Sequence, residues 1–143
     1  MSADGIETIE LQMTILGRWN TSFAADKRWG SLERAAYLLL RQLQNHGPIG
    51  VKALAEELQA DISTVSRQAA VLDKKGYAVK VPDTNDRRAY FYQITEFGRR
   101  ELTQFQQKRL ELISGLLSDW SDEERETFGN LLMKFNESLK GKM

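Results

Sequence analysis

Four hydrogen-bonding side chains fall within five consecutive positions of this 143-residue chain: Ser63, Thr64, Ser66 and Arg67. If the segment is helical, at about 100° per residue, Ser63 and Arg67 share the face opposite three apolar residues, Val65, Ala69 and Leu72. Small hydroxyl side chains let a helix approach base edges closely, and a guanidinium can donate two parallel hydrogen bonds to a guanine. This pattern favours base recognition in the major groove of DNA. The alternative is the solvated face of an ordinary amphipathic helix, and the segment that follows decides between the two.

That segment predicts a β-hairpin with a charged tip. Residues 77–81 and 89–94 have the alternation and aromatic content of strands, and the loop between them ends in Asp86, Arg87 and Arg88. An arginine on a protruding loop can enter the minor groove, and a nearby carboxylate can orient its guanidinium. The alternative is a solvated, charge-rich turn. Because two short helices joined by a tight turn precede the hairpin, the DNA-binding interpretation is favoured.

Most side chains that enzymes and metal sites need are missing. The chain has no cysteine, which excludes disulfides, thiolate nucleophiles and thiol-based redox or metal sensing. It has a single histidine, His46, which is expected to be solvated or to cap a helix end. No Gly-x-Ser-x-Gly elbow or phosphate-binding loop occurs. We therefore expect no enzymatic activity, no cofactor and no metal ion.

The composition indicates one ordinary globular domain. Hydrophobic residues make up 41% and charged residues 28% of the chain, and the formal net charge is zero. Residues 49–94 hold seven basic and six acidic side chains, so DNA affinity would have to come from well-placed contacts in a dimer. The longest apolar runs are too short to span a bilayer, and the N-terminal segment is acidic where a secretory signal is basic. A cytoplasmic location is expected.

Caps and hydrophobic periodicity predict the elements that must position these side chains. Beyond an N-terminal helix over 6–23, the predicted helices cover residues 32–46, 51–58, 62–75, 96–118 and 122–139. Their expected N-caps include Ser31, Asp61, Thr95 and Ser121. Two of the helices are expected to end at Gly47 and Gly76. The predicted fold class is mainly α with a small β-hairpin (α+β), a winged helix-turn-helix between terminal helices.

The terminal helices carry more apolar surface than a single chain needs. The first helix has one stripe at alternating three- and four-residue steps and a second stripe on another side: Ile6, Ile9, Met13, Leu16 and Phe23, then Leu11, Ile15 and Trp19. The last two helices offer further candidates for burial: Leu102, Phe105, Leu112, Ile113, Leu116 and Leu117, then Phe128, Leu131, Leu132, Phe135 and Leu139. Two apolar faces on the first helix indicate that it packs against a partner as well as its own core.

Several motifs resemble the multiple antibiotic resistance regulator (MarR) family of winged helix-turn-helix transcription regulators. The runs LAEEL at 54–58, STVSR at 63–67 and LDKKGY at 72–77 resemble that family's DNA-binding core. DTNDRR at 83–88 and ITEFG at 94–98 resemble its wing and the start of its long helix. The flanking helices match the family's order, so the resemblance covers nearly the whole chain.

The resemblance implies roles for individual residues. The recognition-helix positions that contact bases or phosphates in the family are matched by Ser63, Thr64, Ser66 and Arg67. Arg88 matches the wing arginine that enters the minor groove, and Asp86 matches the carboxylate that orients it. Arg87 lies at a more variable wing position and is expected near phosphate. We further hypothesise that Lys52, at a helix start, holds another phosphate.

The resemblance also implies a homodimer. A single domain over 1–143 would then place dimerisation helices in 1–30 and 100–143 and the DNA-binding region in 31–99. Two-fold symmetry predicts a roughly palindromic operator with half-sites about one helical turn apart. Repression is the commoner role among relatives, so a prokaryotic repressor working on nucleoid DNA is expected. The alternative is a winged-helix protein-interaction module without direct base readout, which the neutral net charge supports.

Many relatives release DNA when a small aromatic or anionic molecule enters a crevice between the dimer helices and the DNA-reading part. Five residues could line such a crevice here: Trp19, Phe23, Trp29, Tyr37 and Arg41. The favoured alternative is that they are core and interface residues. An effector would act only through different affinities for the DNA-competent and incompetent dimers.

Overall fold

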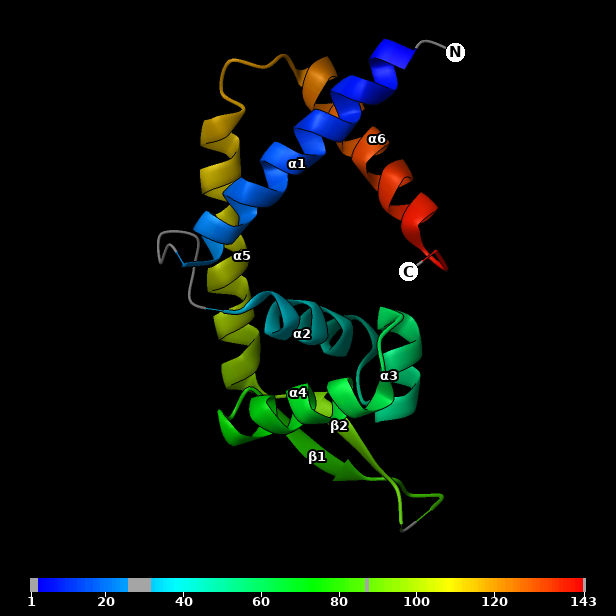
Figure 1. The fold of residues 1–143 in the computed structure, drawn as a ribbon. Coiled ribbons are helices and arrows are strands. Elements are labelled where there is room, and N and C mark those ends of the chain that lie inside the picture. Colours follow the sequence, from blue (N-terminus) through cyan, green and yellow to red (C-terminus); the bar gives the residue numbers. More distant parts are fainter. Residues whose placement is uncertain (1–2, 26–31, 87, 143) are drawn as a thin grey trace.

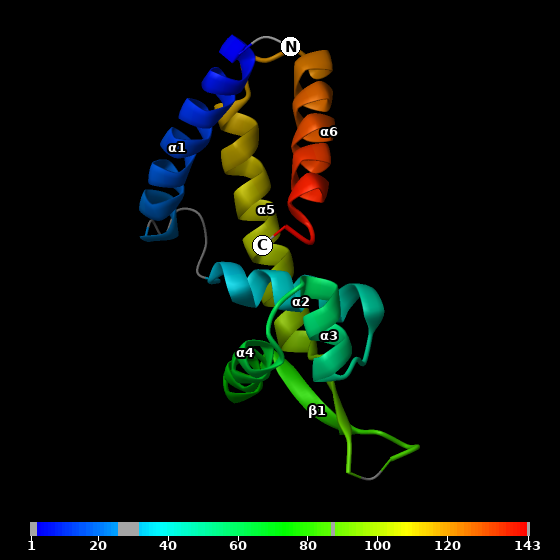
Figure 2. The same ribbon diagram turned by 45° about the vertical axis from the view of Figure 1, so that its right-hand side comes forward.

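The computed structural model describes residues 3–25, 32–86 and 88–142. Six helices and one antiparallel hairpin follow one another along the chain, as the predicted fold class requires (Figure 1). Their bounds are α1 Ala3–Ala25, α2 Arg34–His46, α3 Val51–Leu58, α4 Ile62–Lys74, β1 Ala78–Pro82, β2 Tyr90–Ile94, α5 Glu96–Leu116 and α6 Asp122–Leu139. We call α2, α3, α4, the hairpin and the first half of α5 the reading head. Helices α1 and α6 lie at the end of the molecule opposite the hairpin, as does the far half of α5 (Figures 1 and 2).

The hydrophobic core lies within the reading head. Each of its helices contributes residues from one face, and the hairpin contributes alternate residues, as expected for amphipathic elements that pack around one centre. The buried cluster consists of Leu39, Leu40, Leu43, Leu54, Ala55, Val65, Ala69, Leu72, Ala78, Tyr92, Ile94 and Leu102. Because α4 packs into this core through Val65, Ala69 and Leu72, its opposite face is directed to solvent.

Most of the predicted helix ends are confirmed. The side chains of Asp61, Thr95 and Ser121 cap α4, α5 and α6, and Ser121 forms a full capping box with Glu124. Gly47 and Gly76 have positive φ angles of 72° and 83°, which glycine adopts without steric cost. The predicted start of α2 is wrong: the helix begins at Arg34, after Glu33, whose side chain makes no capping hydrogen bond. Ser31, the expected cap, lies outside the described residues.

An isolated β-bridge joins the hairpin to the segment before α3, which the sequence pattern did not predict. Strands β1 and β2 pair in antiparallel register with Ala78 opposite Ile94. Ile49 bridges to Tyr92 on the other edge of β2 through two backbone hydrogen bonds of 3.1 and 2.9 Å. This bridge attaches the segment before α3 to the hairpin, so the helix-turn-helix and the wing share one framework.

Helices α1 and α6 and the far half of α5, which we call the far helices, leave apolar surface uncovered in the single chain. None of the described residues of α6 is buried, even though several are large and apolar: Leu131 is 58% exposed and Phe128 is 46% exposed. Of the α5 residues expected to be buried, Leu102 and Phe105 are, whereas Ile113 and Leu116 are exposed, because nothing in the described ranges covers these two side chains. None of the helices in the described ranges combines the length and hydropathy that crossing a membrane requires.

Candidate nucleic-acid interface

The four predicted recognition residues lie on the outward side of α4. Ser63 and Arg67 are exposed, and Thr64 and Ser66 are half-buried at the flanks of this face. The Nη2 atom of Arg67 lies 3.4 Å from the Thr64 hydroxyl, to which it donates a weak hydrogen bond. The guanidinium therefore points back towards the first turn of α4. Its other N–H groups make no hydrogen bond with the described residues. A side chain in this position can turn towards a base edge at little cost.

Asp61 organises the N-terminal end of this face. Its carboxylate accepts hydrogen bonds from the Ser63 hydroxyl and from the Thr64 backbone N–H, the latter at 3.3 Å. These bonds, led by that from Ser63, lower the pKa of the Asp61 carboxyl from its ordinary value of 3.8. Asp61 is therefore charged at neutral pH, and the Ser63 hydroxyl directs its lone pairs away from the carboxylate. The sequence predicted Asp61 as a helix cap but did not reveal its hydrogen bond with Ser63.

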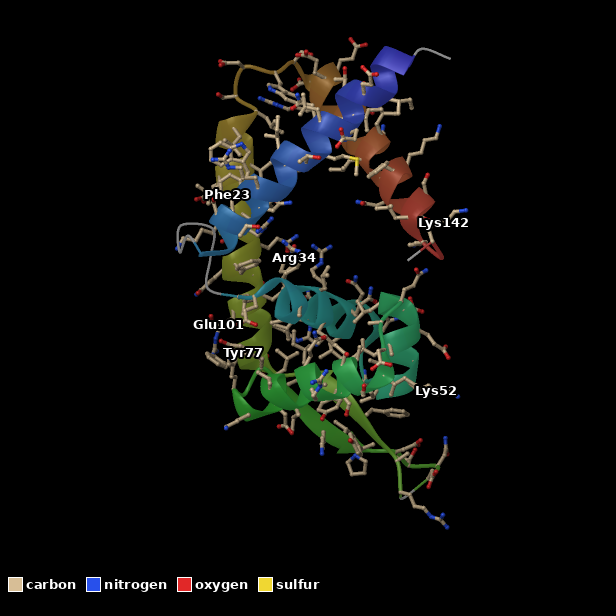
Figure 3. The ribbon with its side chains drawn as sticks, viewed as in Figure 1. Phe23, Arg34, Lys52, Tyr77, Glu101 and Lys142 are labelled. Atoms are coloured by element: carbon tan, nitrogen blue, oxygen red, sulfur yellow. The ribbon has the colours of Figure 1, made fainter. Side chains whose placement is uncertain are left out.

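Lys52 lies at the start of α3, at the end of that helix nearer the hairpin (Figure 3). The residue is exposed, and the N-cap of α3 is Gly50, which has no side chain to bind the first amides. A helix start with free amides and a lysine favours an anion. The structure thus brings Lys52 to the reading head's outer surface, as the phosphate hypothesis requires.

The hairpin tip projects beyond the rest of the molecule (Figures 1 and 2). Two carboxylates shape the loop: Asp83 Oδ1 accepts from the Asn85 backbone N–H at 2.9 Å, and Asp86 Oδ1 accepts from the Arg88 backbone N–H at 3.0 Å. Arg88 is exposed. Asp86 was expected to orient the Arg88 guanidinium, but the bond it makes in this structure is to the Arg88 backbone. Arg87 lies outside the described residues.

The base of the hairpin is fixed by contacts that sequence analysis did not identify. The Thr95 hydroxyl donates to the Gly76 carbonyl at 2.6 Å and accepts from the Gly98 N–H at 3.0 Å, and the Thr95 N–H donates to the Tyr77 carbonyl at 3.0 Å. A Cβ on Gly98 would lie 2.1 Å from the Tyr77 carbonyl oxygen, so only glycine fits. The available signal was the Thr-x-x-Gly spacing at 95–98, which places a cap and a small residue at one helix start. These contacts join the end of α4 to both strands and to α5.

The described candidate effector residues lie in two groups, one on α1 and one on α2. On α1, the rings of Trp19 and Phe23 stack with centroids 6.1 Å apart. On α2, the Arg41 Nη1 donates to the Tyr37 hydroxyl at 2.9 Å, and the Tyr37 ring packs 4.9 Å from that of Phe105 on α5. Trp29 lies outside the described residues. The Tyr37 contacts agree with the alternative interpretation of this residue as part of the core.

Comparisons with known proteins decide the family. A family model described as MarR family matches residues 32–90, which span α2 to the start of β2. The uncharacterized HTH-type transcriptional regulator YxaD of Bacillus subtilis (strain 168) is 44% identical over 135 residues, covering 94% of each chain. This chain belongs to the MarR family of HTH-type transcriptional regulators. It is accordingly a DNA-binding regulator and not an enzyme.

Solved structures show the same fold. A MarR family protein from Bacillus stearothermophilus superposes with a TM-score of 0.78 at 18% identity, covering 97% of this chain and 98% of that one. Streptococcus pneumoniae FabT in complex with DNA gives a TM-score of 0.75 at 18% identity, with 96% and 98% covered. The MarR-like winged-helix architecture therefore extends over the terminal helices as well as the matched core.

Proposed function

We propose that this MarR family regulator is a cytoplasmic repressor that binds a pseudo-palindromic operator as a homodimer. Helix α4 enters the major groove and the hairpin enters the adjacent minor groove. The observation that carries this proposal is the division of α4, with Val65, Ala69 and Leu72 buried in the core and Ser63 and Arg67 exposed on the opposite side.

The residues of α4 have distinct roles in this proposal. Arg67 turns away from Thr64 and donates two hydrogen bonds to a guanine, which discriminates against other bases by ~1–3 kcal/mol. Ser63, Thr64 and Ser66 are short enough to let the helix backbone approach, and their hydroxyls bind base edges or phosphates. Because the Ser63 hydroxyl donates its hydrogen bond to the Asp61 carboxylate, Ser63 meets DNA as a hydrogen-bond acceptor.

The wing and α3 supply contacts that fix the position of the head. Arg88 enters the minor groove, Asp86 holds its backbone, Arg87 binds phosphate, and Lys52 binds a further phosphate at the start of α3. With zero net charge, the chain does not attract DNA through a general positive field. A dimer doubles these few contacts, which gives affinity without a broadly basic surface.

The second copy covers the apolar surface of the far helices. Large hydrophobic side chains are exposed along α1, the end of α5 and α6: Ile6, Ile9, Leu11, Met13, Ile15, Leu16, Trp19, Leu110, Ile113, Leu116, Phe128, Leu131, Leu132, Met133 and Leu139. So many exposed large apolar side chains on three helices indicate an association site. Both stripes of α1 are included, which supports an interlocked two-fold dimer.

A small aromatic or anionic effector would bind between the dimer helices and the reading head. Arg41 offers a cation beside the Tyr37 ring, with the guanidinium 5.7 Å from the ring centroid, and Trp19 and Phe23 on α1 offer aromatic surface. The test is a screen of aromatic carboxylates for release of the operator, with Arg41→Gln as the variant that should lose the response.

The proposed function is tested by selecting duplexes from fragmented genomic DNA with the purified protein. We expect an inverted repeat whose half-sites are centred about 10 base pairs apart. An enriched site with one half only would contradict the dimeric operator. A selection without any enriched sequence would refute direct base readout and favour the protein-interaction module.

A further inference from the structure

One hydrogen bond joins two parts of the molecule that are distant in sequence. The backbone N–H of Gly141, just beyond α6, donates to Oε1 of Gln59 at 3.2 Å. Gln59 lies in the turn between α3 and α4, two residues before the Asp61 cap of the recognition helix. Lys142 lies just beyond the C-terminal end of α6 (Figure 3). The C-terminal tail of the chain thus contacts the turn that leads into α4.

Gln59 is an unusual residue for the backbone conformation it adopts. Its φ and ψ of 51° and 46° are left-handed, and no other non-glycine residue in the described ranges has a positive φ. Helix α3 ends here, with the Ala60 N–H donating to the Ala55 carbonyl at 3.0 Å, in the type of turn where glycine is usual. Because glycine would suit the backbone better, the glutamine is explained by its side chain. A backbone outlier of this kind is grounds for inferring a function.

The tail that meets Gln59 has its own defined shape. Gly141 also has a positive φ, 75°, which turns the chain back after α6. The Lys142 N–H donates to the Leu139 carbonyl at 3.1 Å, and Lys140 Nζ lies 2.9 Å from Glu137 Oε1. The Gly141 N–H is therefore presented to Gln59 by a folded turn rather than by an extended chain end.

We propose that Gln59 is a positioning residue for the recognition helix, tying the turn before α4 to the C-terminal tail. The long helix α5 also joins the reading head to the far helices, but a single helix can bend. The bond from Gly141 to Gln59 is a non-covalent connection on the opposite side of the head from α5 (Figure 1). A head held in one orientation loses less freedom when it binds DNA. The consequence for affinity rests on the proposed DNA-binding role of α4, whereas the consequence for orientation does not.

The test measures the orientation of the head directly. The chain has no cysteine, so Glu57→Cys on α3 and Glu123→Cys on α6 give two specific spin-label sites, both exposed. Labelled chain is diluted with unlabelled chain, and the distance distribution is recorded by pulsed electron paramagnetic resonance without DNA. The variants are Gln59→Gly, a chain ending at Lys140, both changes together, and Gln59→Glu, whose carboxylate can still accept from Gly141.

Gln59→Gly and the shortened chain should broaden the distribution equally, and the double variant should be no broader than either. Gln59→Glu should remain as narrow as wild type. The melting temperature of Gln59→Gly should stay level or rise, because glycine suits the turn, which separates positioning from folding. Operator affinity should fall about two- to tenfold in the broadened variants, the range of one ordinary hydrogen bond.

An unchanged distribution in Gln59→Gly, additive broadening, or tighter operator binding would overturn the proposal. If the wild-type protein selects no operator, the proposed function fails, but the distance distributions still decide whether Gln59 holds the head.

Discussion

Gly98→Ala is expected to show how the wing depends on α5. The added Cβ would lie 2.1 Å from the Tyr77 carbonyl oxygen and 3.0 Å from Ile94 Cγ1, whereas ordinary contact begins at 3.4 Å. Helix α5 or the start of the hairpin must therefore move by about 1.3 Å. Overpacking of this kind costs about 1–3 kcal/mol, and a backbone oxygen cannot rotate away, so the upper end applies. Alanine returns up to ~1 kcal/mol of helix propensity, which leaves a net loss of about 2 kcal/mol.

The matched control is Gly115→Ala in the same helix. Among the described residues, no atom outside the neighbouring residues and backbone of the helix itself lies within 4 Å of a Cβ added there. The same substitution should therefore stabilise the fold by about 0.5–1 kcal/mol, the usual gain in a helix. Urea unfolding at fixed protein concentration measures both changes. Operator affinity should fall for Gly98→Ala alone, because the hairpin carrying Arg88 is displaced. The two changes in unfolding free energy need not be equal in size. A Gly98→Ala variant with unchanged stability and normal DNA binding would contradict the expected clash with Tyr77.

Three further perturbations test other parts of the account. Thr95→Ala removes the α5 cap and the bond to the preceding turn, so the free energy of unfolding should fall by about 1–2 kcal/mol in urea titrations, and an unchanged value would contradict the anchoring role. The hydrogen bond from Ser63 lowers the pKa of Asp61, so the charged carboxylate stabilises the folded state above pH 3.8, and this contribution is lost as the pH falls through the folded-state pKa. In thermal unfolding, the Asp61→Asn variant should therefore lose less stability between pH 5 and pH 3 than wild type. Equal losses would count against the hydrogen bond. Leu131→Asp on α6 should shift the protein to a monomer in light scattering, whereas Val79→Asp on the wing should not, and a dimeric Leu131→Asp protein would contradict the proposed interface.

The local features of this fold were predictable from sequence because their causes are local. Asp61, Thr95 and Ser121 cap helices by binding amides two or three residues ahead, so a short window of sequence contains both partners. The division of α4 into a buried and a polar face likewise follows from helical periodicity. These features cover the helix-turn-helix and much of the candidate interface.

The features that were missed depend on residues brought together from distant positions. The bridge from Ile49 to Tyr92 and the bond from Gly141 to Gln59 have no signature within one segment. The Thr-x-x-Gly spacing at 95–98 indicates a small residue at Gly98 but does not identify Tyr77 as its neighbour. The start of α2 could not be predicted from a cap. The helix begins after Glu33, whose side chain makes no capping hydrogen bond, so packing rather than a cap determines its first residue. Burial on the far helices was overestimated for a single chain, because periodicity cannot tell an internal core from an interface.

The contribution of Arg67 to sequence preference tests the central claim, that α4 reads bases, most directly. Fluorescence anisotropy at two salt concentrations would compare the selected operator with an unrelated duplex of equal length. The proteins would be wild type, Arg67→Ala, and Arg100→Ala as an exposed arginine on α5 away from the reading face. We expect Arg67→Ala to weaken operator binding by about five- to 150-fold and to leave binding of the unrelated duplex little changed, while Arg100→Ala matches wild type. Equal weakening on both duplexes, or a full operator preference without Arg67, would contradict base reading by this helix.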